Sequence, residues 1–397
     1  GRDTSRARDA LVVGQFALTL MLLVASGLLL KSFQRLLATD PGFASQHLLT
    51  ARIDLPESNY ADDAAVAAYD SRLLAKVREA PGVDEAAYTS SLPFDGHLGT
   101  SGFSAEGYSG ADANALEAER QSVDEAYFST LDVPLVEGRT FTAADTATST
   151  PVVIVDETLA RHVWPGRSAI GHRITLDSDH PDAKWMTVVG VVRPVHQNDL
   201  AEPTDRGALY WPYRQHPARF GELVIKSSLP AAALTPALRS AALAVDPQLP
   251  LFDIQTLDER IARSLDHRRA PMLMLALFAS LALLLAAIGV YGVLAFGIAQ
   301  RTREFGVRMA IGAQRGRILG LVLGSGLRLV ALGAVIGCAG AFAVGRALRS
   351  QLYGTGSFDP VVFVGAVVVL AIVALLACWL PARRATRVDP VVALHYE

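Results

Sequence analysis

Four apolar segments, each long enough to cross a lipid bilayer, constrain this chain more than any other feature of its sequence. They occupy residues 10–30, 271–299, 319–344 and 361–380. A spanning helix needs roughly 20 consecutive apolar residues. Because a polar stretch of more than two hundred residues separates the first segment from the second, we expect a membrane protein with four transmembrane helices. One large water-soluble domain is expected between helices one and two.

Basic residues predict the orientation of these helices. Arginines precede the first apolar segment, fill the loop 300–318 between the second and third, and follow the fourth. Short cytoplasmic loops carry an excess of Lys and Arg. Both ends of the chain and the loop 300–318 are therefore expected inside the cell, and the polar domain outside. Arg346 and Arg349 are mild exceptions, because they fall in a loop that is expected outside.

The loop 300–318 combines this basic charge with glycines and with a helix-compatible spacing of Phe305, Met309 and Ile311. The combination is typical of a short helix that lies at the membrane surface and is offered to a partner. A loop that only sets the topology is the alternative, and the residues alone do not decide between the two.

The polar domain is acidic, although the net charge of the whole chain is only −3. It carries no basic stripe, so we do not expect it to bind nucleic acid. We interpret its acidity as a source of solubility rather than as a cation site. Cys338 and Cys378 both fall inside apolar segments, so neither can form a disulfide within the polar domain.

Two β-α-β patterns lie at the two ends of the polar domain. The first has strands at 48–55 and 83–90 around an amphipathic helix at 62–79. The second has strands at 222–226 and 252–256 around a helix at 230–245. Two such halves, separated by an insert, predict a ferredoxin-like split α+β domain whose halves pair.

The insert between these halves, residues 93–213, is expected to be mostly β. Strands are predicted at 152–155, 173–176 and 187–192, and a short helix at 157–163. Residues 95–118 are rich in Gly, Ser and Ala, and we expect a flexible loop there.

Glycines recur at intervals of four residues along the third apolar segment. Small residues at that spacing let helix backbones approach closely in lipid, so we expect a groove that receives a neighbouring helix. Arg328 lies in the same segment and is expected to reach the membrane interface through its long side chain. The predicted packing positions are Gly316, Gly320, Gly324, Gly333 and Gly337.

Enzyme and metal sites are weakly supported by the sequence. No Ser, His and Asp arrangement suggests a nucleophile, and no G-x-x-x-x-G-K-[ST] motif is present to hold ATP phosphates. Five histidines (162, 172, 180, 196 and 216) crowd one region, but their spacing matches no established zinc pattern. We therefore expect no catalytic residue and no metal ligand in this chain.

Several stretches resemble FtsX/MacB-type (type VII) ABC transporter permeases. They are REFGVRMAIGA at 303–313, PARRATRVDPVVALHYE at 381–397, YFSTLDVPLVEGRTF at 127–141, VVIVDETLARHVWPGRSAIGHRI at 152–174 and TVVGVV at 187–192. The resemblance covers essentially the whole chain. The opening residues also resemble the second half of large duplicated permeases, so the chain is interpreted as a possible part of a longer protein.

The resemblance implies three domains. Residues 1–45 would form the N-terminal cytoplasmic segment, the first helix and a stalk. Residues 46–265 would form a MacB-like periplasmic core domain, with porter-like halves at 46–92 and 214–256 and a sabre-like insert at 93–213. Residues 266–397 would form an FtsX-like domain with helices at about 271–299, 319–344 and 361–380, a cytoplasmic coupling loop at 300–318 and a cytoplasmic tail.

The resemblance also implies a function and partners. The chain would be the permease subunit of an exporter or efflux system in the bacterial inner membrane. ATP and Mg²⁺ would be bound by a separate cytoplasmic ABC ATPase, whose motion would be passed to the outer domain (mechanotransmission). A permease dimer or pseudo-dimer, a periplasmic adaptor and membrane lipids are further expected partners. The loop positions that would face or shape the contact with the ATPase are Arg301, Arg303, Glu304, Gly306, Arg308 and Gly312.

Two other functions are alternatives to transport. A regulatory scaffold of the same fold would pass ATPase motion to an outer partner such as a cell-wall hydrolase, and a small outer domain would favour it. A membrane-anchored enzyme would need a catalytic constellation. The large polar domain and the lack of such a constellation favour the transporter, whose substrate the sequence does not identify.

Overall fold

The computed structural model describes residues 2–96, 99–110, 116–176, 183–197, 200, 206–300 and 315–385. The chain divides into two compact units. The membrane unit comprises Gly1–Ala38 and His267–Glu397, and the polar domain comprises Thr39–Asp266.

Four long helices in the described part of the membrane unit are apolar enough to cross a bilayer, as the sequence predicts. The apolar spans are Ala7–Leu37, Arg269–Phe296, Gly326–Ala347 and Pro360–Trp379. They belong to α1 (Arg2–Leu37), α7 (Asp266–Gln300), α9 (Arg315–Ala347) and α10 (Pro360–Ala385), and a short 3-10 helix, η1 (Arg349–Gln351), follows α9.

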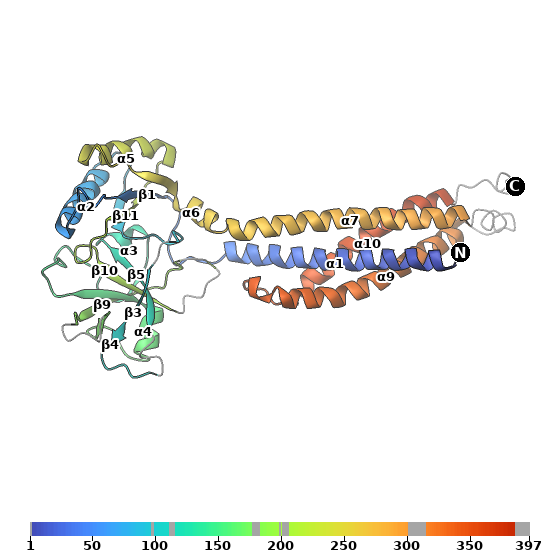
Figure 1. The fold of residues 1–397 in the computed structure, drawn as a ribbon, viewed down its shortest axis with the longest axis horizontal. Coiled ribbons are helices and arrows are strands. Elements are labelled where there is room, and N and C mark those ends of the chain that lie inside the picture. Colours follow the sequence, from blue (N-terminus) through green and yellow to red (C-terminus); the bar gives the residue numbers. More distant parts are fainter. Residues whose placement is uncertain are drawn as a thin grey trace. The chain divides into compact units, whose positions relative to one another are not determined.

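Helix α1 lies between α7 and α9 (Figure 1), and the apolar span of α7 is the least buried of the four. Half of the apolar span in α1 is buried, against 17% of the span in α7. Phe16, Leu20 and Leu28 of α1 are fully buried in a core that they share with Leu370 and other residues of α10. The exposed apolar side chains of α7 are those expected of a helix that faces lipid rather than water.

The two predicted β-α-β halves of the polar domain pair into a ferredoxin-like sheet. Four strands follow the order β12-β1-β11-β2, and each neighbouring pair is antiparallel. Helices α2 and α5 pack together on one face of this sheet (Figure 1). The elements are β1 (Leu48–Asp54), α2 (Asp63–Arg78), β2 (Glu85–Thr89), β11 (Phe220–Lys226), α5 (Ala231–Val245) and β12 (Phe252–Thr256).

Local signals in the sequence explain where these elements begin and end. The Asp62 side chain accepts a hydrogen bond from the Ala65 backbone N–H, which caps the start of α2. Gly82 follows α2 with a φ of +88°, a conformation that costs glycine little. Apolar residues on one side of α2, among them Leu73 and Val77, are fully buried against the sheet.

The insert continues the same sheet instead of forming a separate one. Strand β2 pairs with β5 at Thr89 and Val123, and the order then runs β5-β10-β7-β9-β8-β4. Off this path, β3 pairs with β5 and β6 with β9. The elements are β3 (Gly99–Gly102), β4 (Ser104–Ala105), β5 (Glu117–Val123), α3 (Tyr127–Thr130), β6 (Leu135–Gly138), β7 (Val152–Asp156), α4 (Glu157–Val163), β8 (Arg173–Thr175), β9 (Met186–Val192) and β10 (Ala208–Pro212).

The expectation of a flexible loop at 95–118 is wrong for part of that stretch. Strands β3 and β4 lie within it, and β5 begins at Glu117. Strand β3 is Gly-Thr-Ser-Gly, has no apolar alternation, and pairs with β5 in an antiparallel register. Composition predicts a loop here because it does not reveal such a partner.

The last helix of the polar domain, α6 (Leu257–Ser264), leads directly to the membrane unit. Thr256 and Glu259 form a reciprocal capping box at its start. Leu265 alone separates the end of α6 from Asp266, where α7 begins. Leu257 and Leu265, at the two ends of this short helix, are both buried.

Candidate functional site

The six predicted ATPase-facing positions, from Arg301 to Gly312, lie outside the described residues. The described chain ends before them at Gln300, the last residue of α7, and resumes at Arg315, the first residue of α9. Their role is therefore argued from the sequence and is taken up as a proposal below.

The predicted glycine positions in α9 differ in what surrounds them. A Cβ at Gly333 would lie 2.6 Å from the Phe16 Cβ, and one at Gly337 would lie 2.9 Å from the Leu20 Cβ, so α1 packs directly on both glycines. No described residue has an atom within 4 Å of the equivalent points at Gly320 and Gly324. Gly316 falls in the first turn of α9. The close approach of two helices is thus confined to the later glycines.

Two further glycines of α9 approach other helices and were not predicted. A Cβ at Gly340 would meet the Met21 side chain of α1, and one at Gly326 would lie 2.9 Å from the Cys378 sulfur of α10. Gly340 lies three residues after Gly337, so an i+3 search would have found it. Arg328 is an exposed residue of α9.

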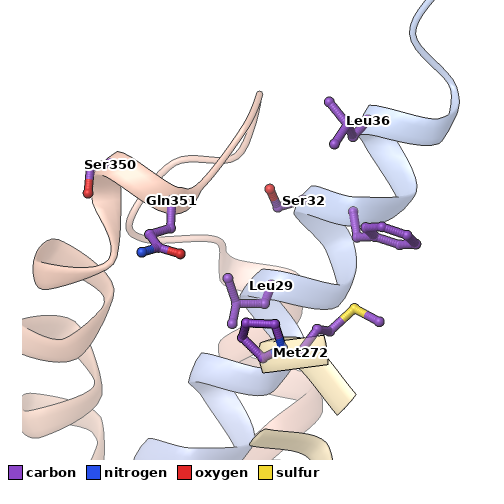
Figure 2. Close-up of a pocket in the computed structure, with 8 residues that line it drawn as sticks. Leu29, Ser32, Leu36, Met272, Ser350 and Gln351 are labelled. Atoms are coloured by element: carbon purple, nitrogen blue, oxygen red, sulfur yellow. The ribbon is translucent and has the colours of Figure 1, made fainter. Parts of the chain in front are cut away.

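Polar side chains at the last turns of α1 bind the segment between α9 and α10. The Lys31 ammonium lies 2.5 Å from an Asp359 carboxylate oxygen, and the Ser32 hydroxyl accepts a hydrogen bond from the Tyr353 backbone N–H at 2.7 Å. Beside them is an open cavity of about 300 Å³ (Figure 2). Its lining comes from three helical segments, with Leu29, Ser32, Phe33 and Leu36 of α1, Pro271 and Met272 of α7, and Ser350 and Gln351 of η1.

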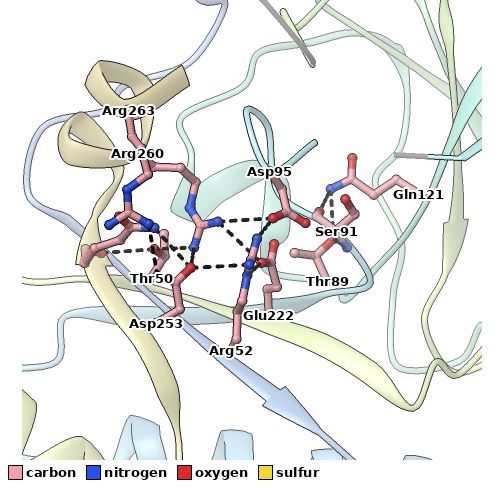
Figure 3. Close-up of polar contacts among 11 residues, drawn as sticks. Thr50, Arg52, Thr89, Ser91, Asp95, Gln121, Glu222, Asp253, Arg260 and Arg263 are labelled. Atoms are coloured by element: carbon pink, nitrogen blue, oxygen red, sulfur yellow. Dashed lines mark hydrogen bonds and ion pairs between the residues drawn. The ribbon is translucent and has the colours of Figure 1, made fainter. Parts of the chain in front are cut away.

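The densest group of charges in the described polar domain is a buried arginine–carboxylate cluster (Figure 3). We use this name for Arg52, Asp95, Glu222, Asp253 and Arg260. The side chains of Asp95 and Glu222 are fully buried, and that of Arg260 is 3% exposed. Arg52 is 15% exposed and Asp253 22% exposed.

Both arginines contact the same three acids. The Arg52 Nε donates a hydrogen bond to a Glu222 carboxylate oxygen at 2.5 Å, and its guanidinium also forms ion pairs with Asp95 and Asp253. Arg260 lies 3.3 Å from Asp95, 3.6 Å from Glu222 and 3.4 Å from Asp253. A planar guanidinium with five donors suits this sharing better than an ammonium group would.

A bulge and strained backbone bring two of these acids into place. The register between β1 and β12 shifts between Thr50 and Arg52, so one extra residue is accommodated in β12. Asp253 lies in this irregular stretch with a φ of +46°, and Phe94, immediately before Asp95, has a φ of +63°. Such conformations are costly for residues other than glycine and tend to persist where surrounding structure holds them.

Burial changes the acid–base properties of the cluster. It raises the pKa of the Glu222 carboxyl, and the two nearby guanidinium groups oppose that rise. It also lowers the pKa of the Arg260 guanidinium, which Glu222 and Asp253 oppose. Since the carboxylates are engaged by arginines, the arrangement is suited to fixing segments together rather than to metal binding or acid–base catalysis.

Sequence reasoning did not find this cluster. Its members lie far apart in the chain, but one pair could have been predicted. Arg52 and Glu222 occupy predicted strands and face each other in the β1–β11 register. A charged residue flanked by apolar residues in each of the two strands, Arg52 between Ala51 and Ile53 and Glu222 before Leu223, is the signal that could have revealed them.

The crowded histidines do not gather into a metal site within the described chain. No group of three or more His, Cys, Asp or Glu side chains there could hold an ion. His172 stacks on Trp164, His216 packs on Trp211, and His162 lies beside Tyr108. His180 falls outside the described residues.

Comparison with protein families decides the identity of this architecture. A MacB-like periplasmic core domain model matches residues 10–244, and an FtsX-like permease C-terminal model matches residues 276–390. The chain belongs to the FtsX/MacB-type ABC transporter permease family. The two matches place the polar domain in the periplasmic core domain and α7, α9 and α10 in the permease C-terminal region, which confirms the resemblance inferred from the motifs.

The relatives that this chain matches include a protein named as an exporter and a protein named as a permease. It is 29% identical over 301 residues to the "Macrolide export ATP-binding/permease protein MacB" of Chromobacterium violaceum, covering 73% of this chain and 45% of the relative. It is 26% identical over 295 residues to the "Uncharacterized ABC transporter permease YknZ" of Bacillus subtilis, covering 71% and 70%. The chain thus spans less than half of the MacB relative.

Among solved structures, the periplasmic region of MacB from Actinobacillus actinomycetemcomitans matches with a TM-score of 0.39. The match has 15% sequence identity and covers 59% of this chain and 98% of that structure.

Proposed function

We propose that this permease couples ATP hydrolysis by a separate cytoplasmic ABC ATPase to movement of the polar domain, and that this movement exports a substrate from the outer side of the bacterial inner membrane. The observation that carries the proposal is the order of the two family matches along four apolar helices. The MacB-like match, 10–244, covers most of α1 and of the polar domain, and the FtsX-like match, 276–390, covers most of α7 together with α9 and α10.

The residues of this sequence contain no G-x-x-x-x-G-K-[ST] motif, so ATP binding is placed outside them, on another chain or on a part of a longer protein. The Chromobacterium relative is named as an ATP-binding and permease protein, and this chain covers 45% of its length. In that relative the name assigns both functions to one protein. For this chain we propose that ATP and Mg²⁺ are bound by a cytoplasmic ABC ATPase, as the permease family implies, and that the permease works as a dimer or pseudo-dimer.

The coupling loop, residues 300–318, is the proposed contact with the ATPase. It carries Arg301, Arg303 and Arg308 beside the acid Glu304, between two apolar segments. Charged groups on such a short loop can fix the register of a partner through complementary charge. Gly306 and Gly312 would shape the backbone of the loop.

Co-purification tests the contact. The full-length chain, solubilised in detergent, would be expressed with the ATPase encoded beside it, as wild type and as the variant Glu304→Lys with Arg308→Glu. We expect wild type to capture the ATPase. The amount of ATPase that co-purifies with the loop variant should be at least tenfold lower, because the charge pattern is inverted. ATP hydrolysis by the captured complex would be measured in parallel.

A second double charge reversal, outside the coupling loop and with a larger change in net charge, guards against a general effect of altered charge. Arg346→Glu with Arg349→Glu changes two arginines in the last turn of α9 and in η1, in the loop predicted to lie outside. This control should capture the ATPase as wild type does. Equal capture by the coupling-loop variant would refute the assignment of the loop, and no capture by folded wild type would refute the partnership itself.

A further inference from the structure

The polar domain is joined to the membrane unit through two chain segments. One runs from α1, which ends at Leu37, to β1, which begins at Leu48. The other is α6, which ends at Ser264, two residues before α7 begins. Any force that passes along the chain between the units enters the polar domain through β1 or α6.

The arginine–carboxylate cluster binds both of these segments. Arg52 belongs to β1 and Arg260 to α6, and each contacts Asp95, Glu222 and Asp253. A direct bond strengthens the connection, because Arg260 also donates a hydrogen bond to the Thr50 hydroxyl of β1 at 3.2 Å. The segment that enters the domain and the segment that leaves it are therefore held by one set of acids (Figure 3).

The shared acids also reach deeper into the sheet. Glu222 lies on β11, the strand between β1 and β2, and Asp95 follows β2. A displacement of Arg260 would thus act on the central strands of the ferredoxin-like part as well as on β1. Arg263, 63% exposed, adds one contact to Asp253 from the surface.

Stability alone does not account for such a cluster. Well-packed apolar side chains of similar volume often stabilise a protein as much as a buried ion network or more, because desolvating the charges is costly. Two of the acids also depend on left-handed backbone at Phe94 and Asp253. Buried charge and backbone strain together suggest selection for directional, geometrically defined contacts.

We infer that the arginine–carboxylate cluster is a positioning device that locks β1 and α6 to each other. Arg260 keeps α6 from shifting when α7 moves, so that the movement reaches the sheet. The inference rests on the proposed coupling to an ATPase, and it identifies where the polar domain receives that movement. Arg52 and Arg260 are positioning residues, acting through the three acids.

The test compares two paired substitutions in the full-length chain, assembled with its partner ATPase in nanodiscs. Arg260→Met with Glu222→Gln removes one positive and one negative charge from the cluster with little change in volume. Arg78→Met with Asp124→Asn is the matched control. It removes a partly buried ion pair of 3.0 Å that links α2 to the residue after β5 and does not involve α6.

Amide hydrogen exchange would be measured with and without a non-hydrolysable ATP analogue. In the cluster variant we expect exchange in residues 257–264 to accelerate at least tenfold, while exchange in β7 and β9 stays unchanged. We also expect the nucleotide-dependent change that wild type shows in β1 and β11 to be lost. The Arg78 control should show the wild-type exchange rate in residues 257–264 and the wild-type nucleotide-dependent change in β1 and β11. Arg260→Lys, which retains the positive charge, should show an intermediate exchange rate and part of the nucleotide-dependent change.

The outcomes separate the two proposals. If wild type itself shows no nucleotide-dependent change in the polar domain, the proposed coupling fails and this inference fails with it. If wild type responds and the cluster variant responds equally, the coupling stands and the inference is overturned. Unchanged exchange of residues 257–264 in both Arg260 variants would also overturn it, whatever the ATPase does.

Discussion

The arginine–carboxylate cluster and the carboxyl of Asp70 both lie inside the polar domain, but their partners differ. The three acids of the cluster are matched by two guanidinium groups. Asp70, on α2, is 3% exposed and accepts a hydrogen bond from the Tyr213 hydroxyl, with tyrosine rings rather than arginines around it. Burial raises the pKa of Asp70 to about 7, and the hydrogen bond from Tyr213 opposes the rise.

The comparison teaches that burial has two distinct consequences for acids in this domain. Where arginines contact a buried acid, as at Glu222, their charge opposes the rise in pKa that burial causes, and the ion pairs direct the position of other segments. An acid with neutral partners shifts its proton affinity instead, because the charged form is poorly solvated. Loss of a partner should therefore damage the first site, whereas a change of pH should act mainly on the second.

The largest effect is expected from Arg260→Met. The substitution leaves Asp95 and Glu222, both fully buried, with only Arg52 to compensate them. Removing one partner of a buried ion pair costs about 3–5 kcal/mol, so the free energy of unfolding of the polar domain should fall by that amount. Denaturant unfolding of the full-length chain, followed by tryptophan fluorescence, would measure it.

Arg263→Met is the control for this prediction. Arg263 is on the same helix and contacts the same Asp253, but its side chain is 63% exposed. Exposed ion pairs contribute about 0–1 kcal/mol. If Arg260→Met and Arg263→Met lowered the free energy of unfolding equally, the cluster would not differ from a surface contact. The distinction drawn above between the cluster and Asp70 would then be wrong.

A smaller effect, with a defined pH range, is expected from Asp70→Asn. The folded pKa of Asp70 is about 7, against an ordinary value of 3.8. A raised carboxyl pKa stabilises the fold fully below the unfolded value, and this contribution is lost as the pH rises through the folded value. Wild type should therefore gain on the order of 2–3 kcal/mol from Asp70 between pH 8 and pH 5.

The asparagine variant should lack this part of the pH dependence, because its side chain stays neutral while its oxygen still accepts from Tyr213. Wild type and variant would be unfolded with urea at intervals between pH 5 and pH 8. Asp124 and Asp156 also have raised pKa values of about 7 through burial, so the difference between the two proteins, not the slope of either, isolates Asp70. Parallel curves would show that Asp70 titrates normally.

Much of the fold could be predicted because its signals are local. The apolar runs define α1, α7, α9 and α10, and the Pro81–Gly82 break marks the end of α2. Strand β10, Ala-Leu-Tyr-Trp-Pro, is wholly buried and was missed although it carries an apolar run, but other missed strands lack such signals. Strand β5 is mostly polar and β6 is wholly exposed, so their pairing with β10 and β9 depends on residues far away in the sequence.

The sites were less accessible than the fold. The i+4 spacing predicts a glycine face on α9, but it does not reveal which glycines are packed. Helix α1 packs on Gly333 and Gly337, whereas no described residue packs in the same way on Gly320 or Gly324. In the cluster, only the Arg52–Glu222 pair follows from strand register. Asp95 and Asp253 depend on left-handed backbone at Phe94 and Asp253, which no pattern in the sequence indicates.

A small effect is expected from Arg139→Gln, which completes the comparison with a pair near the surface. Arg139 forms two hydrogen bonds with Asp145, and its side chain is 45% exposed. The pair lowers the pKa of Asp145, an effect that burial opposes. Water can replace the lost contacts, so the free energy of unfolding should fall by about 0.5–1 kcal/mol at pH 7 and less in 1 M salt.

The expected change in stability is small, but its dependence on salt gives a more specific test. Urea unfolding at low and high ionic strength would show whether the difference between wild type and Arg139→Gln shrinks as the charges are screened. The corresponding difference for Arg260→Met should persist in salt, because its partners are buried away from the solvent ions. If both differences responded to salt equally, burial would not be what separates the cluster from the surface pair, and the case for the cluster as a fixed connection between β1 and α6 would lose its physical basis.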